Sequence, residues 1–392
     1  MRKSYRRKHG SIYETLSEVK QNENNLLQSN LNLFSETCDE LSGYGVYSGD
    51  STFIKRNEAN TLASRVMKRF SNGELAYGQE TYWTTRLSDQ SNSWLGVALV
   101  ERMSIDETVT TVAAQQMKKI DAQDKAKKLF VYDAGHGLKL LAAQQACINS
   151  DIILRVKSHQ VFYYEPNYKG RGRPAKYGKR FKLNEIKQEA DHQTVIAFKE
   201  QRLRISSYLG LHAAKFMNIP LLVLKLEFLD KDDNAIFQKA IWLISTALEL
   251  NPESIARAYL WRSSHELSFR FIKQHLGLTK NQSPELKACD NWLQLVALAM
   301  NLLLAIRDEL EFKAKPWYPK KNDRAVSQRQ AQKQALSFFA KLPSLTKAPQ
   351  PAGKAWGRPK GHSPPRRIRH PVIRKTIKKA KLCPSCPFKQ AA

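Results

Sequence analysis

The sequence predicts an α/β protein in which a mixed sheet with flanking helices is interrupted by a β-rich insertion. Three observations lead to this fold class. Strand-like and helix-like segments alternate over residues 44–157, strand-like segments with polar turns fill 158–247, and two amphipathic helices follow over 248–312. A helical lead-in is expected over 1–43, and a basic, partly disordered tail over 313–392.

Each element rests on its own pattern. Alternating or continuous apolar runs of four to ten residues indicate strands, and apolar residues at a period near 3.6 indicate helices. We expect strands over 44–50, 74–87, 93–102, 128–133 and 151–157, and helices over 105–123, 138–148, 252–277 and 284–310.

Positive charge is concentrated at one end of the chain. The 392 residues include 64 Lys and Arg against 36 Asp and Glu, a formal net charge of +28. Residues 313–392 hold 21 basic residues and one acid, for a net charge of +20, whereas residues 1–312 hold 43 against 35, for +8. A basic extension favours a polyanionic partner, because phosphate binding releases counterions. We expect nucleic acid, with an anionic membrane surface as the alternative.

Neither export nor membrane insertion is indicated. The basic segment MRKSYRRKHG is followed by no apolar stretch and no small-residue cleavage site. The most apolar run, 292–306, contains Gln294 and Asn301 and is shorter than the roughly 18 residues of a membrane span. Five scattered cysteines form no disulfide framework. We therefore expect a cytoplasmic protein without a membrane partner.

Three acidic residues are candidates for one site. Asp50 and Asp133 each end a strand, and Glu266 lies on the helix expected over 252–277. Taken singly, each aspartate would be interpreted as a turn or cap residue. Together, three carboxylates can bind two divalent cations about 4 Å apart, a pair that activates water or a 3′-hydroxyl in phosphodiester chemistry.

Four polar residues share one face of the 252–277 helix. Tyr259, Arg262, Glu266 and Lys273 fall within about 60° of one another on the helical wheel. This set suits a metal and phosphate site in which Glu266 is an oxygen ligand. The alternative is a solvated face with Arg262 paired to Glu266. A separate apolar stripe is expected to pack on the sheet, namely Leu260, Leu267, Phe271 and Leu278.

Two short basic segments are candidates for nucleic-acid contact. Residues 169–180 hold six Lys and Arg interleaved with aromatic residues, and their Arg-Gly-Arg-Pro core resembles an AT-hook, which lies in the minor groove. A second segment, GRPKG, occurs in the tail. An exposed basic loop is the alternative, and it too would contact phosphates. The residues expected to bind DNA are Arg171, Arg173, Lys176, Lys179, Arg180, Arg358 and Lys360.

Two further features carry little weight. Cys383 and Cys386 are half of a zinc site with no second pair, so no structural zinc is expected. His136, which follows Asp133, is interpreted as a loop histidine and not as a catalytic base.

The spacing Tyr259-x2-Arg262-x3-Glu266-x6-Lys273 resembles the Y-R-E-K pattern of bacterial insertion-sequence transposases of the DDE type with a β-strand insertion domain. All four positions match. Other segments resemble the subgroup known as DDE-superfamily endonucleases over about residues 5–375; they include GDSTFIKRNEANTLASR, VYDAGHGLKLL, RGRPAKYGKRFKL and ELSFRFIKQHLGL.

The resemblance implies an RNase H-like core in which Asp50, Asp133 and Glu266 form the catalytic triad and hold two Mg2+ ions, for which Mn2+ can substitute. Tyr259 and Arg262 would contact DNA phosphates near the transposon end, and Lys273 would contact DNA beside the cleaved strand. The implied reaction is cut-and-paste transposition: an element end is nicked by hydrolysis, and the freed 3′-hydroxyl attacks a phosphodiester of target DNA.

The resemblance also implies partners and a location. A homodimer would hold two terminal inverted repeats together with target DNA at the bacterial nucleoid. Family members usually carry more sequence before the YRRKHG-like segment, so a copy shortened at its N-terminus is expected. Two alternatives stay open: a catalytically inactive or truncated relic that only binds DNA, and a basic RNA- or membrane-associated protein whose acids are structural.

Overall fold

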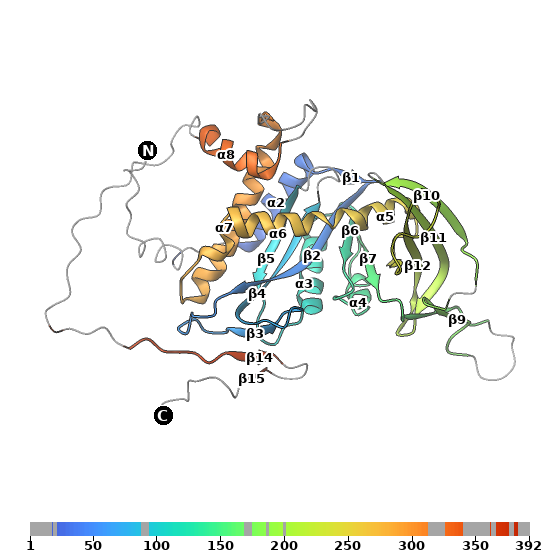
Figure 1. Ribbon diagram of the computed structural model, residues 1–392, viewed down its shortest axis with the longest axis horizontal. Helices are drawn as coiled ribbons and strands as arrows, with labels where there is room; N and C mark the ends of the chain where they lie inside the picture. Colours follow the sequence, from blue (N-terminus) through green and yellow to red (C-terminus); the bar gives the residue numbers. More distant parts are fainter. Residues whose placement is uncertain are drawn as a thin grey trace.

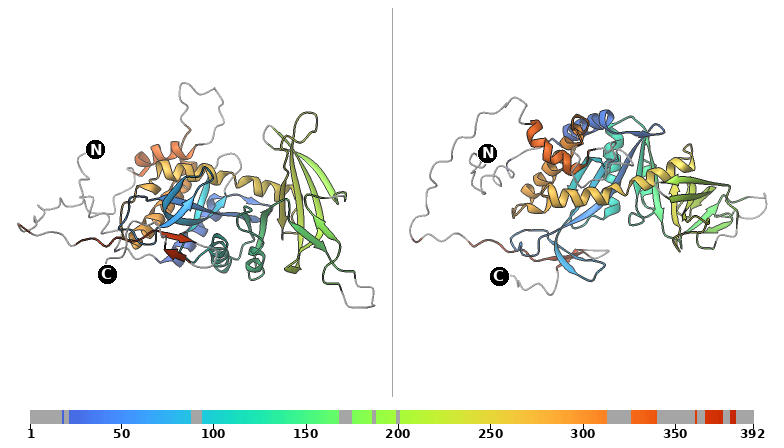
Figure 2. Two further views of the ribbon diagram at one scale, coloured as in Figure 1. Left: turned by 60° about the horizontal axis from the view of Figure 1, so that its bottom comes forward. Right: turned by 45° about the horizontal axis from the view of Figure 1, so that its top comes forward.

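The structure is a computed structural model that describes residues 18, 22–87, 94–167, 175–185, 188–198, 201–312, 326–339, 361, 366–375 and 380–382. In this part of the chain the strands pair into one 15-stranded mixed sheet with helices on both faces (Figures 1 and 2). The predicted α/β class, with a β-rich insertion, is confirmed.

The described helices are α2 (Glu23–Thr37), α3 (Val109–Gln123), α4 (Leu140–Gln144), α5 (Pro252–Trp261), α6 (Ser264–His275), η1 (Leu278–Lys280), α7 (Leu286–Ala305), η2 (Arg307–Glu309) and α8 (Gln328–Phe339). The described strands are β1 (Glu40–Leu41), β2 (Tyr44–Lys55), β3 (Val66–Arg69), β4 (Leu75–Leu87), β5 (Leu95–Arg102), β6 (Lys128–Tyr132), β7 (Ser150–Val156), β8 (Val161–Tyr164), β9 (Arg180–Lys182), β10 (His192–Phe198), β11 (Gln201–Ala213), β12 (Phe216–Leu229), β13 (Ile241–Ser245), β14 (Ile373–Lys375) and β15 (Ala380–Leu382).

The centre of the sheet has the order β5-β4-β2-β6-β7. Strand β4 runs antiparallel to both β2 and β5, whereas β6 runs parallel to both β2 and β7. An antiparallel group continued by two parallel strands is the RNase H-like arrangement that the sequence resemblance implied.

Strand β6 shows why these residues form a central strand. Every residue of its sequence KLFVY is buried, because α3 and α4 cover one face of the sheet and α5 and α6 cross the other (Figure 1). Its single charged residue, Lys128, is fully buried, and its Nζ donates to the carbonyl oxygens of Asp124 and Ala126, both at 2.6 Å. These bonds compensate for the lost hydration of the ammonium group.

The β-rich insertion continues the core sheet instead of forming a second one. Strand β13 pairs antiparallel with β7 on one side and with β12 on the other. Strand β11 then pairs with β12, β10 and β8, so the insertion extends the sheet away from the core (Figure 1). Its position relative to the core is therefore set by backbone hydrogen bonds along β7.

The single helix predicted over 252–277 is interrupted. Asn251 caps α5, because its side chain accepts a hydrogen bond from the Ser254 N–H at 2.7 Å, and Pro252 occupies the first turn. At Arg262 and Ser263 the backbone forms a turn with i→i−3 hydrogen bonds, including Arg262 N–H to the Tyr259 carbonyl at 3.1 Å. Helix α6 then begins at Ser264.

This interruption changes which residues face the core. Phe271 and Leu278 of the predicted stripe are buried, and Leu260 is half-buried, but Leu267 is 48% exposed, so its predicted burial is wrong. Each residue of a tight i→i−3 turn advances about 120° instead of about 100°, which rotates α6 relative to an uninterrupted helix. His265 and Ser268 occupy the buried face instead.

Helix α7 lies within the helix predicted over 284–310 and begins six residues before the apolar run 292–306. By length and composition it could cross a membrane, and a little over half of its most apolar window is buried within the protein. It packs against the edge strand β5, where the Asn301 side chain pairs with the main chain of Val97: Oδ1 accepts from the N–H at 2.7 Å and Nδ2 donates to the carbonyl at 2.9 Å. The side-chain amide thus takes the place of a neighbouring strand.

The lead-in helix and part of the tail also contact the sheet. Phe34 of α2 packs so closely on Gly96 of β5 that a Cβ there would lie 2.1 Å from its ring. At the other edge, β14 pairs in parallel with β3 through Ile373 and Val66. The buried Arg65 helps to anchor this segment: its guanidinium donates to the carbonyl of His370 at 3.4 Å, and its own carbonyl accepts from the Ile373 N–H at 2.8 Å.

We expect Asn301→Leu to destabilise the protein by about 2–4 kcal/mol, because it leaves the buried N–H and carbonyl of Val97 without partners. Urea denaturation measures the change. The control Asn24→Leu, at an exposed position on α2, should change stability by no more than about 0.5 kcal/mol. Equal stability of both variants would show that Asn301 does not cap β5.

Candidate active site

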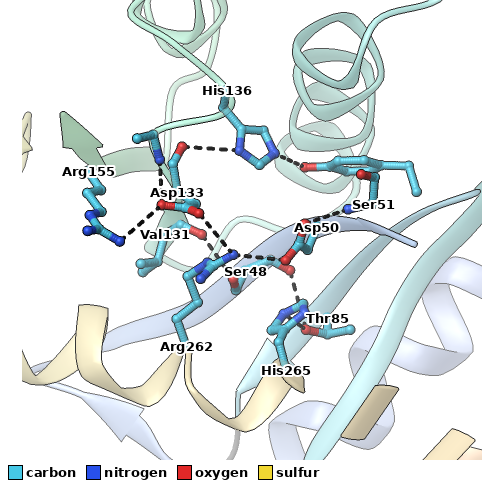
Figure 3. A network of polar contacts seen from close by, with 12 residues as sticks. Ser48, Asp50, Ser51, Thr85, Val131, Asp133, His136, Arg155, Arg262 and His265 are labelled. Atoms are coloured by element: carbon cyan, nitrogen blue, oxygen red, sulfur yellow. Dashed lines mark hydrogen bonds and ion pairs between the residues drawn. The ribbon is translucent and has the colours of Figure 1, made fainter. Parts of the chain in front are cut away.

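Asp50 and Asp133 come together at one end of two neighbouring strands. Strands β2 and β6 are parallel, and Ser48 pairs with Val131. Each aspartate lies two residues beyond one of these partners, so both side chains point to the same face of the sheet (Figure 3). The sequence predicted the two strand ends, and the register brings them side by side.

Arg262 bridges the two carboxylates. Its Nη2 lies 2.8 Å from Asp50 Oδ2 and 3.9 Å from Asp133 Oδ2 (Figure 3). The guanidinium projects from the interruption between α5 and α6, and its side chain is 15% exposed. In the described part of the chain Arg262 forms ion pairs with these aspartates and none with Glu266, so the alternative of an Arg262–Glu266 pair is wrong.

Backbone N–H groups also orient both carboxylates. The N–H of Ser51 donates to Asp50 Oδ1, and the N–H of Ala134 donates to Asp133 Oδ1, each at 2.7 Å. Burial raises the pKa of the Asp50 carboxyl; Arg262 and the Ser51 N–H oppose this shift, and the negative charge of Asp133 adds to it. A positive charge between the two carboxylates is therefore favourable.

A second cation, Arg155, was missed by the sequence analysis. Its Nη1 on β7 lies 3.7 Å from Asp133 Oδ1 (Figure 3). Burial raises the pKa of the nearby Tyr259 hydroxyl, and the positive charge of Arg155 opposes this shift. Tyr259 itself is only 7% exposed. The signal in the sequence is weak, because Arg155 is the single basic residue of a strand that also contains Asp151.

Glu266 lies apart from the two aspartates. It is exposed in the first turn of α6, and no group of three His, Cys, Asp or Glu side chains that could hold a metal ion is found among the described residues. The interruption at Arg262 and Ser263 separates Glu266 from the face it was expected to share. The three-carboxylate set stays a prediction.

Lys273 lies in the electrostatic field of Asp50. It is half-buried, and burial together with the neighbouring charges of Lys68 and Lys55 lowers the pKa of its ammonium group, whereas Asp50 raises it. Lys55 and Lys68 are themselves ion-paired, with Glu74 at 2.7 Å and with Glu80 at 2.8 Å. Lys273 is therefore the lysine of α6 whose positive charge is suited to bind phosphate beside Asp50.

Two buried histidines lie beside the carboxylates. His265, immediately before Glu266, is 1% exposed, and its Nε2 lies 2.6 Å from the Thr85 hydroxyl. Burial lowers its pKa to about 3. His136 lies in a loop as predicted but is only 4% exposed, and burial lowers its pKa to about 4. Both imidazoles are neutral near pH 7.

The predicted DNA-binding residues are only partly described. Lys176, Lys179 and Arg180 are exposed next to β9, with Lys176 Nζ 5.4 Å from the centre of the Tyr177 ring. In the tail, Arg366, Arg367, Arg369 and Arg374 are exposed. The remaining candidates lie outside the described residues, namely Arg171, Arg173, Arg358 and Lys360, and so do Cys383 and Cys386 of the half zinc site.

The two aspartates fit a divalent cation. Carboxylate oxygens are the ligands that hard cations such as Mg2+ prefer, and here two of them converge on one positively charged nitrogen. Arg262 Nη2 thus stands where a cation is stabilised by both carboxylates. Among the described residues, no third carboxylate lies beside them.

The chain was compared with known protein families, curated sequences and solved structures. Residues 98–302, slightly more than half of the chain, match the family described as "Transposase DDE domain". The matched range includes Asp133 and Glu266 and begins after Asp50. No curated protein sequence matches the chain.

Among solved structures, the chain is similar to a piggyBac transposase in a synaptic complex with hairpin DNA, studied by cryo-electron microscopy. The two share 9% sequence identity with a TM-score of 0.37. The alignment covers 77% of this chain and 55% of the piggyBac chain, so it spans little more than half of that protein.

The depressed pKa of His265 predicts a dependence of stability on pH. Its pKa is about 3 in the folded protein and about 6.5 in the unfolded chain, so protons bind preferentially to the unfolded chain. The stabilisation is complete above pH 6.5 and is lost as the pH falls toward 3. Between pH 7 and pH 5 we expect the wild type to lose about 2 kcal/mol more than His265→Gln in urea denaturation.

The matched control for this measurement is His192→Gln, at an exposed position on β10. It should follow the wild type at both pH values. Parallel pH profiles for the wild type and His265→Gln would contradict the assignment of a buried, neutral imidazole.

Proposed function

The chain belongs to the DDE transposase domain family, a family of DNA-cleaving and strand-transferring enzymes, and on that premise we propose that it is a cut-and-paste DNA transposase. It hydrolyses a phosphodiester bond at each transposon end and transfers the freed 3′-hydroxyl into target DNA. The observation that supports this proposal most directly is the convergence of Asp50 and Asp133 on one cation, Arg262 Nη2.

The carboxylates are proposed to hold Mg2+, for which Mn2+ can substitute. When bound, a pair of such ions supplies an activated water or 3′-hydroxyl and stabilises the leaving oxygen. Asp50 and Asp133 hold their oxygens in place through the N–H groups of Ser51 and Ala134. Glu266, four residues after Arg262, is the proposed third ligand.

Basic and phenolic groups around the carboxylates are proposed to bind DNA phosphates. Arg262 contacts Asp50 directly at 2.8 Å, and the charge of Lys273 also interacts with that of Asp50. Arg155 is added to the predicted set, because it lies beside Asp133 and its charge acts on the Tyr259 hydroxyl. The proposed substrate is double-stranded DNA, comprising terminal inverted repeats and a target, bound by a homodimer.

The basic segments outside the site are proposed to bind the phosphates of the DNA backbone. Lys176, Lys179 and Arg180 are exposed on the insertion, and four exposed arginines lie on residues 366–375 of the tail, which lie along the β3 edge. Contacts of this kind depend little on base sequence and weaken as salt increases. The tail and the insertion thus add affinity, while the carboxylates supply the chemistry.

One observation favours a second candidate function. Glu266 is exposed and lies apart from the two aspartates. A chain in which this carboxylate does not complete the site would bind DNA without cleaving it. This second candidate is a catalytically inactive transposase relic.

A plasmid assay distinguishes the two candidates. With supercoiled plasmid carrying the element ends and Mg2+ or Mn2+, we expect the wild type to nick DNA, and Asp50→Asn, Asp133→Asn and Glu266→Gln each to nick about 10³-fold more slowly. DNA retention on a gel should be unchanged in these variants. Asp106→Asn, at an exposed position outside the site, is the control with full activity. Plasmid binding by the wild type without nicking supports the relic.

A direct consequence of the geometry concerns metal affinity. Arg262 and a divalent cation compete for the same two carboxylates, so Arg262→Gln should bind Mn2+ about tenfold more tightly than the wild type in the absence of DNA. Electron paramagnetic resonance of free Mn2+ measures the change. Arg257→Gln, which removes an arginine paired with Glu253 on α5, is the matched control. Weaker Mn2+ binding by Arg262→Gln would show that the carboxylates do not bind the cation where Arg262 lies.

A further inference from the structure

A buried polar chain lies on the side of the two aspartates away from Arg262 (Figure 3). The hydroxyl of Tyr82, a fully buried residue of β4, lies 2.9 Å from His136 Nε2. The His136 Nδ1 lies 3.3 Å from the main-chain carbonyl oxygen of Asp133. The chain therefore connects β4 to the residue that follows β6, although β2 lies between these strands.

The partners of His136 assign its tautomer. A carbonyl oxygen only accepts hydrogen bonds, so Nδ1 carries the proton and donates to Asp133. The other nitrogen, Nε2, then holds a lone pair and accepts from the Tyr82 hydroxyl. The imidazole is thus bonded at both nitrogens and fixed in orientation.

The bond to Asp133 acts on the carboxylate through the backbone. The peptide group between Asp133 and Ala134 is planar, so its carbonyl and its N–H turn together. The carbonyl accepts from the side chain of His136 and also from its main-chain N–H at 3.1 Å, while the Ala134 N–H donates to Asp133 Oδ1 at 2.7 Å. Fixing this peptide therefore also fixes the carboxylate.

Gly49 leaves the space in which the Tyr82 hydroxyl passes β2 to reach His136. A Cβ at Gly49 would lie 2.1 Å from the Tyr82 hydroxyl oxygen and 3.0 Å from the Tyr132 ring. Because Gly49 directly precedes Asp50, the same short segment of β2 carries the carboxylate on one face and admits Tyr82 on the other. The main chain at His136 is also held by α3, because the Thr110 hydroxyl donates to the His136 carbonyl at 2.5 Å.

We propose that His136 and Tyr82 are positioning residues that hold Asp133 at a defined place relative to Asp50, with Gly49 as the position that lets Tyr82 reach His136. Neither side chain touches the cation position occupied by Arg262 Nη2. Both act through the Asp133–Ala134 peptide and through the packing of Tyr82 under β2. Their role in a reaction rests on the proposed function, whereas the hydrogen bonds from Tyr82 to His136 and from His136 to Asp133 are tested separately.

Two substitutions of His136 separate positioning from packing. The amide nitrogen of His136→Asn can take the place of Nδ1 and keep the bond to Asp133, whereas the longer side chain of His136→Gln takes the place of Nε2 and loses it. We expect His136→Gln to raise the Mn2+ concentration that half-saturates plasmid nicking by about 10- to 100-fold, and His136→Asn to restore most of this loss. Tyr82→Phe, which removes only the hydroxyl, should give an intermediate shift.

A packing role predicts the reverse order, because Gln is closer to His in volume than Asn is. Equal loss in both His136 variants, or an unchanged Mn2+ dependence in Tyr82→Phe, would overturn the proposal. Circular dichroism melting of each variant identifies any that fail to fold, and Asp106→Asn serves again as the control outside the site.

Two measurements test the chain without relying on activity. Nitrogen-15 NMR of labelled histidines should show His136 with its proton on Nδ1, and a proton on Nε2 would overturn the assignment. Gly49→Ala should lower the melting temperature less in a Tyr82→Phe background than in the wild type, because the variant lacks the oxygen that the new methyl meets at 2.1 Å. Additive effects would show that the two positions are not coupled.

The failures of the two proposals are distinguishable. A wild type that neither nicks plasmid nor binds Mn2+ refutes the proposed function and with it the positioning role, even if the NMR and melting results show that the chain exists. If the wild type nicks plasmid, and His136→Gln, His136→Asn and Tyr82→Phe all show the same Mn2+ dependence as the wild type, the positioning role alone is refuted.

Discussion

The parallel pairing of β2 with β6 brings two carboxylates to one place, and the surrounding site depends on how their mutual repulsion is offset. Asp50 and Asp133 each lie two residues beyond the Ser48–Val131 pair, and a parallel ladder gives them no freedom to separate. Burial and like charge both raise the pKa of Asp50. The guanidinium of Arg262 at 2.8 Å is the largest opposing influence. A cation between these strands is therefore part of the fold as well as of the proposed chemistry.

The position of Arg262 depends on a local departure from helical geometry. A continuous helix over 252–277 would have placed Arg262 and Glu266 on one face, as their spacing indicates. The turn at Arg262 and Ser263 instead directs Arg262 to the aspartates and leaves Glu266 exposed. His265 occupies the buried position beside Thr85, where its neutral imidazole packs beneath the carboxylate layer. The positions of Arg262 and Glu266 are thus both set by one turn of backbone.

The sheet also sets where positive charge is available. Strand β13 joins the insertion to β7, the strand that carries Arg155, and β14 joins part of the tail to β3, the strand that carries Lys68. Both basic segments are consequently attached to edges of the same sheet that holds the aspartates. Positive charge along one continuous sheet raises the local concentration of a polyanion such as DNA near the site. It does not select a particular base sequence.

The sequence by itself determined the class of fold, the β-rich insertion, the two strands that end in aspartates and the helical segment that carries Tyr259, Arg262, Glu266 and Lys273. These features are local, because hydrophobic periodicity and residue spacing reflect short-range geometry. Only the tertiary structure decided that Arg262 lies between Asp50 and Asp133, that Arg155 and His136 adjoin Asp133, and that Leu267 is exposed. Strand register and a two-residue turn decide these contacts, and both arise from packing between segments about 80 to 210 residues apart in the chain.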